Sequence, residues 1–170
     1  MDRQNDGILS SVGGWRSAVA IAALTLLALA AVLLRWQQHG FGRGTVTIDG
    51  RVTVRVQVAA SDITRERGLA GRTSLGQDEG VLFLFSEPRQ YPFWMGGMKL
   101  PIEAVWFRDG TVVDLTYGLE PPGEGETPQV FRPIEPAGAV LEVPAGFIGR
   151  NDIRIGQTAS AEIDRQGGLR

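Results

Sequence analysis

The stretch YPFWMGGMKLPIEAVWFRDGTVVDL, residues 91–115, combines a dense aromatic segment with a hairpin signal. Its first eight residues contain Tyr, Phe, Trp and two Met, with a Gly-Gly pair between the methionines. After a proline, two apolar segments flank Asp109-Gly110, a dipeptide that favours a two-residue turn because both residues tolerate positive φ. The stretch therefore predicts a β-hairpin, formed by residues 102–107 and 111–115, with an aromatic cluster before it.

The rest of the domain also predicts short strands. A second hairpin is expected around Asp49-Gly50, because apolar and polar residues alternate near this pair. Residues 81–85, VLFLF, form a continuous apolar run that is typical of a strand buried on both faces. The predicted strands comprise residues 45–48, 52–58, 81–85, 102–107, 111–115, 139–143 and 157–163.

A short helix is expected among these strands. Ser61 is suited to cap its start and Gly68 to end it, so the pattern predicts a helix over Asp62–Arg67. A helix this short must dock on the sheet to be stable. The predicted fold class is mainly β with one or two short helices, arranged as a small barrel or a strongly curled antiparallel sheet and preceded by one transmembrane helix.

The N-terminal region contains an apolar segment, residues 18–34, that has no charged residue and lies between Arg16 and Arg35. Its length is at the short end of what spans a hydrocarbon core of about 30 Å. Trp15 and Trp36 lie just outside its two ends, where indole rings favour the membrane interface. We expect an uncleaved transmembrane anchor; a cleaved signal peptide and a buried core helix are the alternatives.

This anchor sets the expected domain organisation and location. The chain divides into a short tail (1–17), the transmembrane anchor or uncleaved signal (18–34), a linker (35–44), a single β-rich domain (45–165) and a second tail (166–170). The sequence thus predicts a single-pass membrane protein that contacts the membrane through its N-terminal helix. Its domain is expected in the periplasmic or extracellular space, because a long domain after one N-terminal anchor is usually exported.

Charge and residue types argue against several classes of function. From residue 44 onward the chain has 13 Lys and Arg against 17 Asp and Glu and no basic run, so no nucleic-acid partner is expected. Cysteine is absent and the single histidine, His39, precedes the domain, which argues against a zinc site, a thiolate nucleophile or a serine triad. No glycine-rich phosphate loop is present. We therefore expect no metal and no cofactor.

Six short segments occur in an order that resembles a known family. They are RGLAGR at 67–72, GVLF at 80–83, FWM at 93–95, PIE at 101–103, Asp109-Gly110, and VLEVPAG at 140–146. Together they resemble the family named domain of unknown function 192, over residues 52–158. That family has no settled activity, so the resemblance implies a fold and a set of positions. Many members carry an N-terminal signal or lipid anchor, which implies export.

The chain departs from the family pattern in two places. Many members read FWMKNT where this chain reads FWMGGM, so Gly96 and Gly97 replace a lysine and an asparagine. Members usually have an aspartate after Pro-Ile or Pro-Leu, where this chain has Glu103. A ligand that relatives recognise through that Lys and Asn is not expected to be recognised in the same way here.

The aromatic segment supplies the first candidate site. Phe93, Trp94 and Met95 would offer a flat, adaptable surface to a ligand, and the two glycines after them would open space beside Trp94. The alternative is structural: the aromatic side chains close the end of the barrel and the glycines form a tight turn.

Charged residues supply the other candidates. Glu103 is the best candidate for a catalytic group, because apolar neighbours would bury it and burial raises the pKa of a carboxyl. Alternatively, it accepts backbone N–H bonds or pairs with an arginine. Arg67 and Arg72 would bind an anionic group, or fix their loop through ion pairs. Glu142 is a further ligand-binding candidate, and it would form a carboxylate dyad of the glycosidase type if it lay beside Glu103.

Two classes of function follow from these candidates. The favoured one is a binding or interaction module that holds a small molecule, glycan or peptide against Trp94, Met95 and nearby arginines. The alternatives are a carboxylate-dependent hydrolase or lyase acting on cell-envelope material, with Glu103 at its centre, and a structural accessory of a membrane complex. The sequence does not decide whether the domain is an enzyme.

Overall fold

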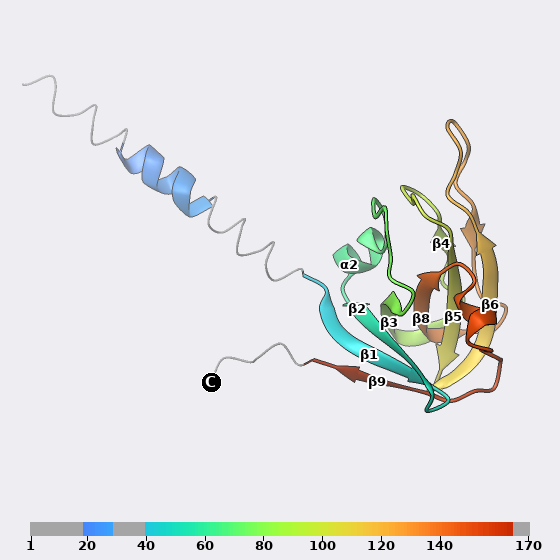
Figure 1. Ribbon diagram of the computed structural model, residues 1–170. Coiled ribbons are helices and arrows are strands. Elements are labelled where there is room, and N and C mark those ends of the chain that lie inside the picture. The colour runs from blue at the N-terminus through green and yellow to red at the C-terminus, as the bar shows by residue number, and fades with distance from the viewer. Residues whose placement is uncertain (1–18, 29–39, 165–170) are drawn as a thin grey trace, which may run out of the picture. The chain divides into compact units, whose positions relative to one another are not determined.

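The computed structural model describes residues 19–28 and 40–164, which belong to two units (Figure 1). Residues 19–28 form an α-helix with exposed apolar side chains. No helix within the described ranges is both long and apolar enough to cross a membrane. The predicted anchor, residues 18–34, extends beyond the described helix and stays a prediction. The predicted tails, 1–17 and 166–170, lie outside the described residues.

The second unit begins at Phe41 and is built mainly from β-strands, as predicted. Its elements, in chain order, are β1 (Gly42–Ile48), β2 (Val52–Ala59), α2 (Asp62–Arg67), β3 (Glu79–Arg89), β4 (Phe93–Trp94), β5 (Ile102–Arg108), β6 (Thr111–Leu119), β7 (Val130–Phe131), β8 (Ala137–Pro144), α3 (Phe147–Arg150) and β9 (Ala159–Ile163). Within residues 40–164, seven strands form one sheet in the order β6-β5-β8-β3-β2-β1-β9, and β4 pairs with β7.

Both Asp-Gly hairpins form as predicted. Asp49 and Gly50 lie between β1 and β2, Asp109 and Gly110 lie between β5 and β6, and φ is positive at all four residues. Turns with this conformation match the right-handed twist of the paired strands. The local sequence therefore determines where the chain reverses direction.

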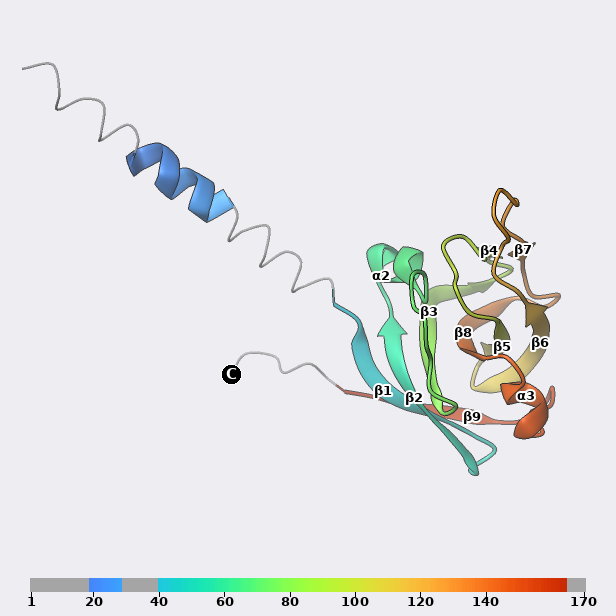
Figure 2. The same ribbon diagram turned by 45° about the horizontal axis from the view of Figure 1, so that its top comes forward.

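One pair of strands is parallel, which corrects the prediction of an antiparallel sheet. β2 pairs with β3 in parallel, and the other pairs described in the large sheet are antiparallel. Parallel neighbours cannot be joined by a tight turn, so the chain crosses over through α2 and the loop after it. Figures 1 and 2 show α2 at one end of these two strands. An alternating or apolar pattern carries no information about strand direction, which is why the sequence did not predict this pair.

The sheet is not closed into a barrel, although its two edges meet at one place. β6 and β9 are the edge strands. Thr111 in β6 forms an isolated antiparallel bridge with Thr158, just before β9, and the Val112 N–H donates to the Gln157 carbonyl at 2.9 Å. The sheet thus curls until its edges touch at one end (Figure 2). The barrel alternative is not confirmed.

Strands β3, β5 and β8 are buried on both faces of the sheet. On one face, side chains such as Leu82 and Val105 pack in a core with residues of β1, β2 and α3. On the other face, side chains such as Phe83 and Trp106 pack in a second core with Met95 and Met98. This arrangement explains the continuous apolar run in β3, as predicted. The candidate site lies on the face of the second core.

The sequence did not predict two small elements, α3 and the pair formed by β4 and β7. In the pair, Phe93 lies opposite Phe131 and Trp94 opposite Val130. Both elements are too short to show a periodic pattern in the sequence. The β4–β7 pair nevertheless matters for function, because it holds the aromatic segment in place.

Candidate functional site

A cavity of about 230 Å³ lies between α2 and the aromatic segment, which we define as residues 91–98. The residues that line it are 65–70 from α2 and the following loop, Phe83 and Phe85 from β3, residues 91–94, Gly96 and Met98 from the aromatic segment, and Glu142 from β8. The fold thus brings four segments of the chain together around one space.

The position of α2 is fixed by hydrogen bonds at its start and along its side. Ser61 caps the helix: its Oγ accepts from the Thr64 N–H, and Thr64 Oγ1 accepts from the Ser61 N–H at 3.0 Å. Arg65 donates to the Leu84 carbonyl of β3 at 2.8 Å and to Asp62 at 2.6 Å. These bonds connect α2 to the sheet, so the cavity has a fixed wall on this side.

Aromatic rings form a second wall. The ring of Phe93 meets Phe83 edge-on, with centroids 5.0 Å apart, and meets Trp106 edge-on at 5.3 Å. Phe85 and Tyr91 are stacked with centroids 3.8 Å apart. Such pairs contribute about 0.5–1.5 kcal/mol each beyond their burial. The aromatic wall is therefore held in place by its own contacts before any ligand binds.

Glu142 contributes a buried carboxyl group to this cavity. The residue is 5% exposed, and alternation along β8 places it on the same face as Val140, a member of the second core. No hydrogen bond or ion pair joins its carboxyl group to another residue that the structure describes. Every fully enclosed side-chain nitrogen or oxygen in the described residues has a partner, so the unpaired oxygens of Glu142 must reach the cavity space.

Burial raises the pKa of Glu142 from 4.5 to about 8. The cause is lost hydration, which disfavours the charged carboxylate more than the neutral acid. The group therefore holds a proton at neutral pH, and a raised carboxyl pKa in a cleft is a feature of functional sites. Among the residues that the structure describes, no cluster of His, Asp and Glu is arranged to hold a metal ion.

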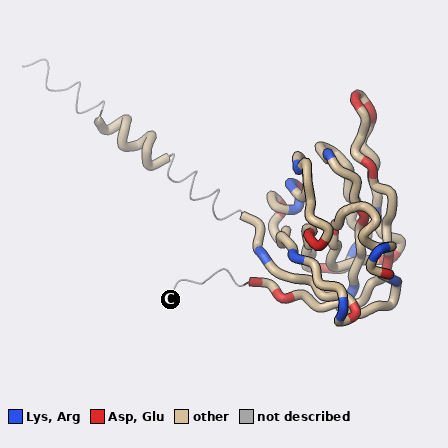
Figure 3. The backbone as a smooth tube through the Cα atoms, viewed as in Figure 1, with Lys and Arg blue, Asp and Glu red and all other residues tan. Residues whose placement is uncertain are grey.

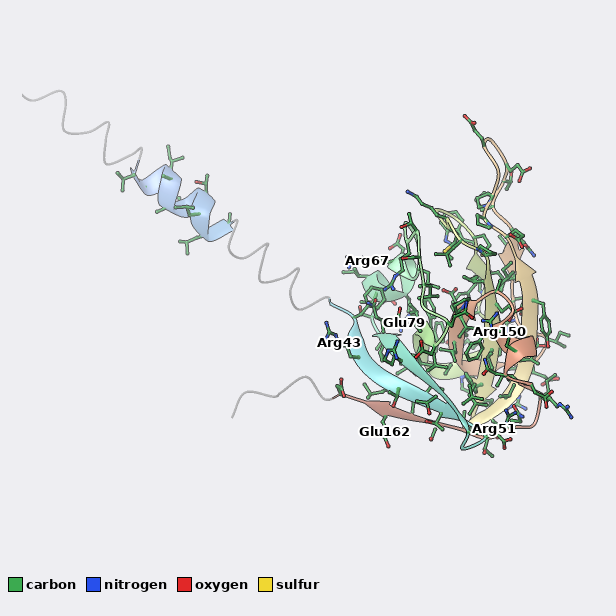
Figure 4. The ribbon with its side chains drawn as sticks, in the orientation of Figure 1. Arg43, Arg51, Arg67, Glu79, Arg150 and Glu162 are labelled. Atoms are coloured by element: carbon green, nitrogen blue, oxygen red, sulfur yellow. The ribbon has the colours of Figure 1, made fainter. Side chains whose placement is uncertain are left out.

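Trp94 and Arg67 lie at the rim of the cavity. Trp94 is 63% exposed, and a Cβ added to Gly96 would lie 2.9 Å from three carbons of its indole ring. Glycine at this position thus makes room for the ring itself, which corrects the expectation of open space beside Trp94. Arg67 is exposed, and its guanidinium lies 5.9 Å from the centre of the Phe41 ring (Figure 4).

Met95 and Arg72, two of the predicted ligand contacts, do not line this cavity. Met95 is fully buried in the second core. Arg72 donates a hydrogen bond to Gln57 and lines a separate cavity of about 550 Å³ beside β1, β2 and β9. Arg43 and Glu162, which also line that second cavity, are labelled in Figure 4.

Glu103 is buried, but it faces the opposite core. It is 6% exposed, and it accepts a hydrogen bond from the Ile148 N–H of α3 at 2.8 Å. Glu103 lies opposite Val143 and Ala104 lies opposite Glu142, so the two glutamates project from neighbouring strands to opposite faces. The two carboxyl groups therefore do not form the glycosidase-type dyad that was conditional on their lying side by side. The contact with α3 favours the structural alternative for Glu103.

Sequence reasoning identified Arg67, Phe93, Trp94 and Glu142, and all four line the cavity. It does not identify Phe85, because a continuous apolar run such as that of β3 indicates a buried strand and does not single out a site residue. Alternation within that run contained the signal, since every second side chain faces the second core. This alternation points to Phe85 only when it is known which face of the sheet carries the site, and the sequence does not show that.

Comparisons with known proteins agree with this fold. The family model of domain of unknown function 192 (DUF192), described as uncharacterized ACR, matches residues 44–161. One similar solved structure is the crystal structure of a candidate transcription regulator from Sinorhizobium meliloti 1021. Its sequence is 28% identical to this chain and the TM-score is 0.65. The matched region covers 72% of this chain and 95% of the regulator's chain. A second is the crystal structure of a protein of unknown function from Novosphingobium aromaticivorans DSM 12444. Its sequence is 30% identical to this chain and the TM-score is 0.60. The matched region covers 68% of this chain and 83% of the second protein's chain. No curated protein matches. Because the family model matches more than half of the chain, the chain belongs to the DUF192 family.

Proposed function

We propose that the domain is a binding module whose ligand enters the cavity between α2 and the aromatic segment. The observation that carries this proposal is Glu142, a buried carboxyl group that has no partner among the described residues and lies at an aromatic wall. A buried polar group left unpaired costs about 1–3 kcal/mol. A ligand that supplies the missing partner would offset this cost, which favours binding at this position.

The size of the cavity limits the ligand. About 230 Å³ lies below the range of about 300–1,000 Å³ that is typical of sites for drug-sized molecules. The cavity would therefore hold a small molecule, or one terminal group of a glycan or peptide. Trp94, exposed at the rim, would contact the part of a longer ligand that stays outside.

A pair of alanine substitutions tests this proposal. Trp94→Ala removes the ring at the rim, and we expect it to weaken binding by about tenfold, as loss of an aromatic contact does at other binding sites. Tyr117→Ala is the matched control, because Tyr117 is also exposed, at 55%, but lies on β6 away from the cavity.

Ligands would be detected by saturation-transfer NMR with a mixture of small amines, sugars, carboxylates and short peptides. The proposal fails if the wild type binds no member of the mixture, or if the two variants bind equally well.

The buried carboxyl group of Glu142 also supports an alternative function, that of a carboxylate-dependent hydrolase or lyase acting on cell-envelope material. A carboxylic acid that stays protonated near pH 7 suits general acid catalysis, so the catalytic role would pass from Glu103 to Glu142. Under this alternative, Glu142→Gln would retain the ligand and abolish its turnover. Mass spectrometry decides the matter: a bound ligand recovered unchanged after long incubation with the wild type contradicts catalysis.

We further propose that residues 18–34 hold the domain at a membrane, on its periplasmic or extracellular side. The uncharged apolar sequence between Arg16 and Arg35 supports this, as does the helical conformation of residues 19–28. Alkaline phosphatase fused after the domain would be active only if the domain is exported. An inactive but stable fusion would contradict this location.

Nucleic-acid binding receives no support from the charge distribution, although one relative is described as a candidate transcription regulator. Figure 3 shows Lys and Arg interspersed with Asp and Glu along the described chain, without a continuous basic stretch. A duplex-binding domain needs clustered cations to displace counterions. We therefore expect no retention of duplex DNA at physiological salt in a gel-shift assay.

A further inference from the structure

We propose that the cavity is specific for a protonated amine, whose ammonium group pairs with Glu142 while its apolar body packs against the aromatic wall. This inference rests on the proposed function, because it names the ligand class for the same cavity. Three features of the site carry it: the unpaired carboxyl group, the rings around it, and the arrangement of the charged side chains nearby.

The unpaired carboxyl group selects for hydrogen-bond donors. A carboxylate only accepts hydrogen bonds, whereas an ammonium group only donates them, through three N–H groups. Their pairing would satisfy the oxygens of Glu142 that no described residue contacts. An alcohol would supply one donor and no charge, and an anionic ligand would place like charges together or require Glu142 to stay protonated.

The aromatic wall favours the same ligand. The face of an aromatic ring attracts a cation that lies within about 6 Å of its centre. One such contact already exists here, because the guanidinium of Arg65 lies 5.2 Å from the centre of the Phe85 ring. Phe83, Tyr91 and Phe93 also line the cavity and would present further rings to a ligand.

The charged side chains of α2 that line the cavity leave the carboxyl group available. Arg65 is held by two backbone carbonyls and by Asp62. Arg67 and Glu66 are exposed to solvent. None of these side chains is hydrogen-bonded to Glu142, so its carboxyl group is free to pair with a cation that the ligand brings.

Amine binding would release a proton. Glu142 holds a proton near pH 7 because burial raises its pKa to about 8. When the ammonium group enters, the carboxyl O–H bond breaks, its proton passes to solvent, and the carboxylate pairs with the ammonium, which keeps its own protons. Affinity therefore rises with pH up to about 8. The residues opposite Glu142, Val81 and Ala104, do not titrate, and the Tyr91 hydroxyl donates to the Glu87 carbonyl.

The test compares three probes that share a phenyl ring and differ in their head group: benzylamine, benzyl alcohol and benzoate. Binding to the full-length chain would be measured by isothermal titration calorimetry in two buffers of different ionisation enthalpy, which reports proton release. We expect benzylamine to bind about tenfold more tightly than benzyl alcohol, because hydrogen bonds to charged groups are stronger than neutral ones. Near pH 7, close to one proton should be released for each benzylamine bound.

Two variants locate the effect. Glu142→Gln keeps the shape of the side chain without its charge, and it should abolish both the preference for benzylamine and the proton release. Glu120→Gln is the control, because Glu120 is an exposed carboxylate that does not line the cavity, and it should leave both unchanged. The comparison of probes on the wild type does not depend on either variant folding.

The outcomes separate this inference from the proposed function. If benzyl alcohol or benzoate binds as tightly as benzylamine, amine specificity fails while binding in the cavity stands. Benzylamine binding without proton release, or unchanged in Glu142→Gln, would also overturn the inference. If none of the three probes binds although a sugar or a carboxylate of the NMR mixture does, the inference fails and the proposed function stands. If nothing binds, both fail.

Discussion

Glu142 sits in the middle of β8 with apolar neighbours on both adjacent strands, Val81 on β3 and Ala104 on β5. An apolar residue here would extend the second core, as Val140 does two positions earlier. The carboxyl group instead loses its hydration and gains no partner among the described residues, which raises its pKa to about 8. Position 142 therefore lowers the stability of the free domain and keeps an ionisable group in the cavity.

Glu142→Gln should change how the stability of the domain depends on pH. The pKa of Glu142 is about 8 in the folded state and 4.5 when unperturbed, so the folded state binds this proton more tightly than the unfolded state. Wild-type stability should therefore fall as pH rises from about 4.5 to about 8, by up to about 1.4 kcal/mol per pH unit from this group. Glutamine cannot titrate, so the variant should lack this slope.

Urea unfolding at a series of pH values between 5 and 8 would measure the two slopes. Glu66→Gln, an exposed glutamate of the same cavity, serves as the control and should follow the wild type. Parallel pH profiles for the wild type and Glu142→Gln would show that the carboxyl group is not protonated by burial.

The aromatic segment combines a structural half and an exposed half within a few residues. Met95 is fully buried, and its carbonyl accepts from the Met98 N–H at 3.2 Å in a tight turn. The Gly71 N–H donates to the Gly97 carbonyl at 2.8 Å, which joins this turn to the loop after α2. Trp94, 63% exposed, projects outward over Gly96. The binding and structural interpretations of this segment therefore apply to different residues of it.

The two glycines of this turn should respond differently to substitution. Gly96→Ala places a Cβ 2.9 Å from the Trp94 ring, so the indole must move, although the exposed ring can do so at little cost in stability. Gly97 has φ of +72°, a conformation that costs roughly 1 kcal/mol for alanine and less for asparagine. Gly97→Ala should lower the melting temperature more than Gly96→Ala, and Gly97→Asn should lie between Gly97→Ala and the wild type.

The indole N–H resonance of Trp94 in NMR spectra distinguishes the two effects. Only Gly96→Ala should shift it strongly. The same shift in Gly97→Asn, or none in Gly96→Ala, would contradict the close contact between the ring and the Gly96 backbone.

Elements with local signals were predictable, whereas those that depend on strand pairing were not. Ser61 and Gly68 fixed the bounds of α2, and the two Asp-Gly pairs fixed their hairpins, because each signal acts within a few residues. Glu103 and Glu142 look alike in the sequence, since each is flanked by apolar residues in a strand. The pairing of β5 with β8 decides that they face opposite cores, and register is not encoded locally.

At the scale of the whole domain, β9 is the edge strand at which the curled sheet meets its other edge, β6. It pairs with β1 along residues 159–163, and the segment just before it bonds to β6. The Ala159 N–H donates to the Gly110 carbonyl at 2.7 Å, and the Gly156 N–H donates to the Val112 carbonyl at 2.8 Å. The chain at and just before β9 thus covers backbone groups at the start of β6, which would otherwise be open to pairing with other chains.

Gly44→Ala should loosen one end of β9 without opening this contact with β6. A Cβ on Gly44 would lie 2.3 Å from the Glu162 carbonyl oxygen, so the end of β9 must move away from β1. The Asp164 N–H, which donates to the Arg43 carbonyl at 2.8 Å, should then lose protection from hydrogen exchange. The Val112 N–H, bonded to the Gln157 carbonyl at the other end, should stay protected.

Gly149→Ala is the control, because a Cβ at this position in α3 meets no atom within 4 Å. It should leave the exchange of both amides unchanged, and it should raise stability slightly, since alanine favours the helix over glycine. If Gly44→Ala removed protection at Val112 as well, β9 and the edge of β6 would open as one cooperative unit. The expectation that the two ends of β9 open independently would then be wrong, and the contact between β6 and β9 would depend on the full length of the β1–β9 pair.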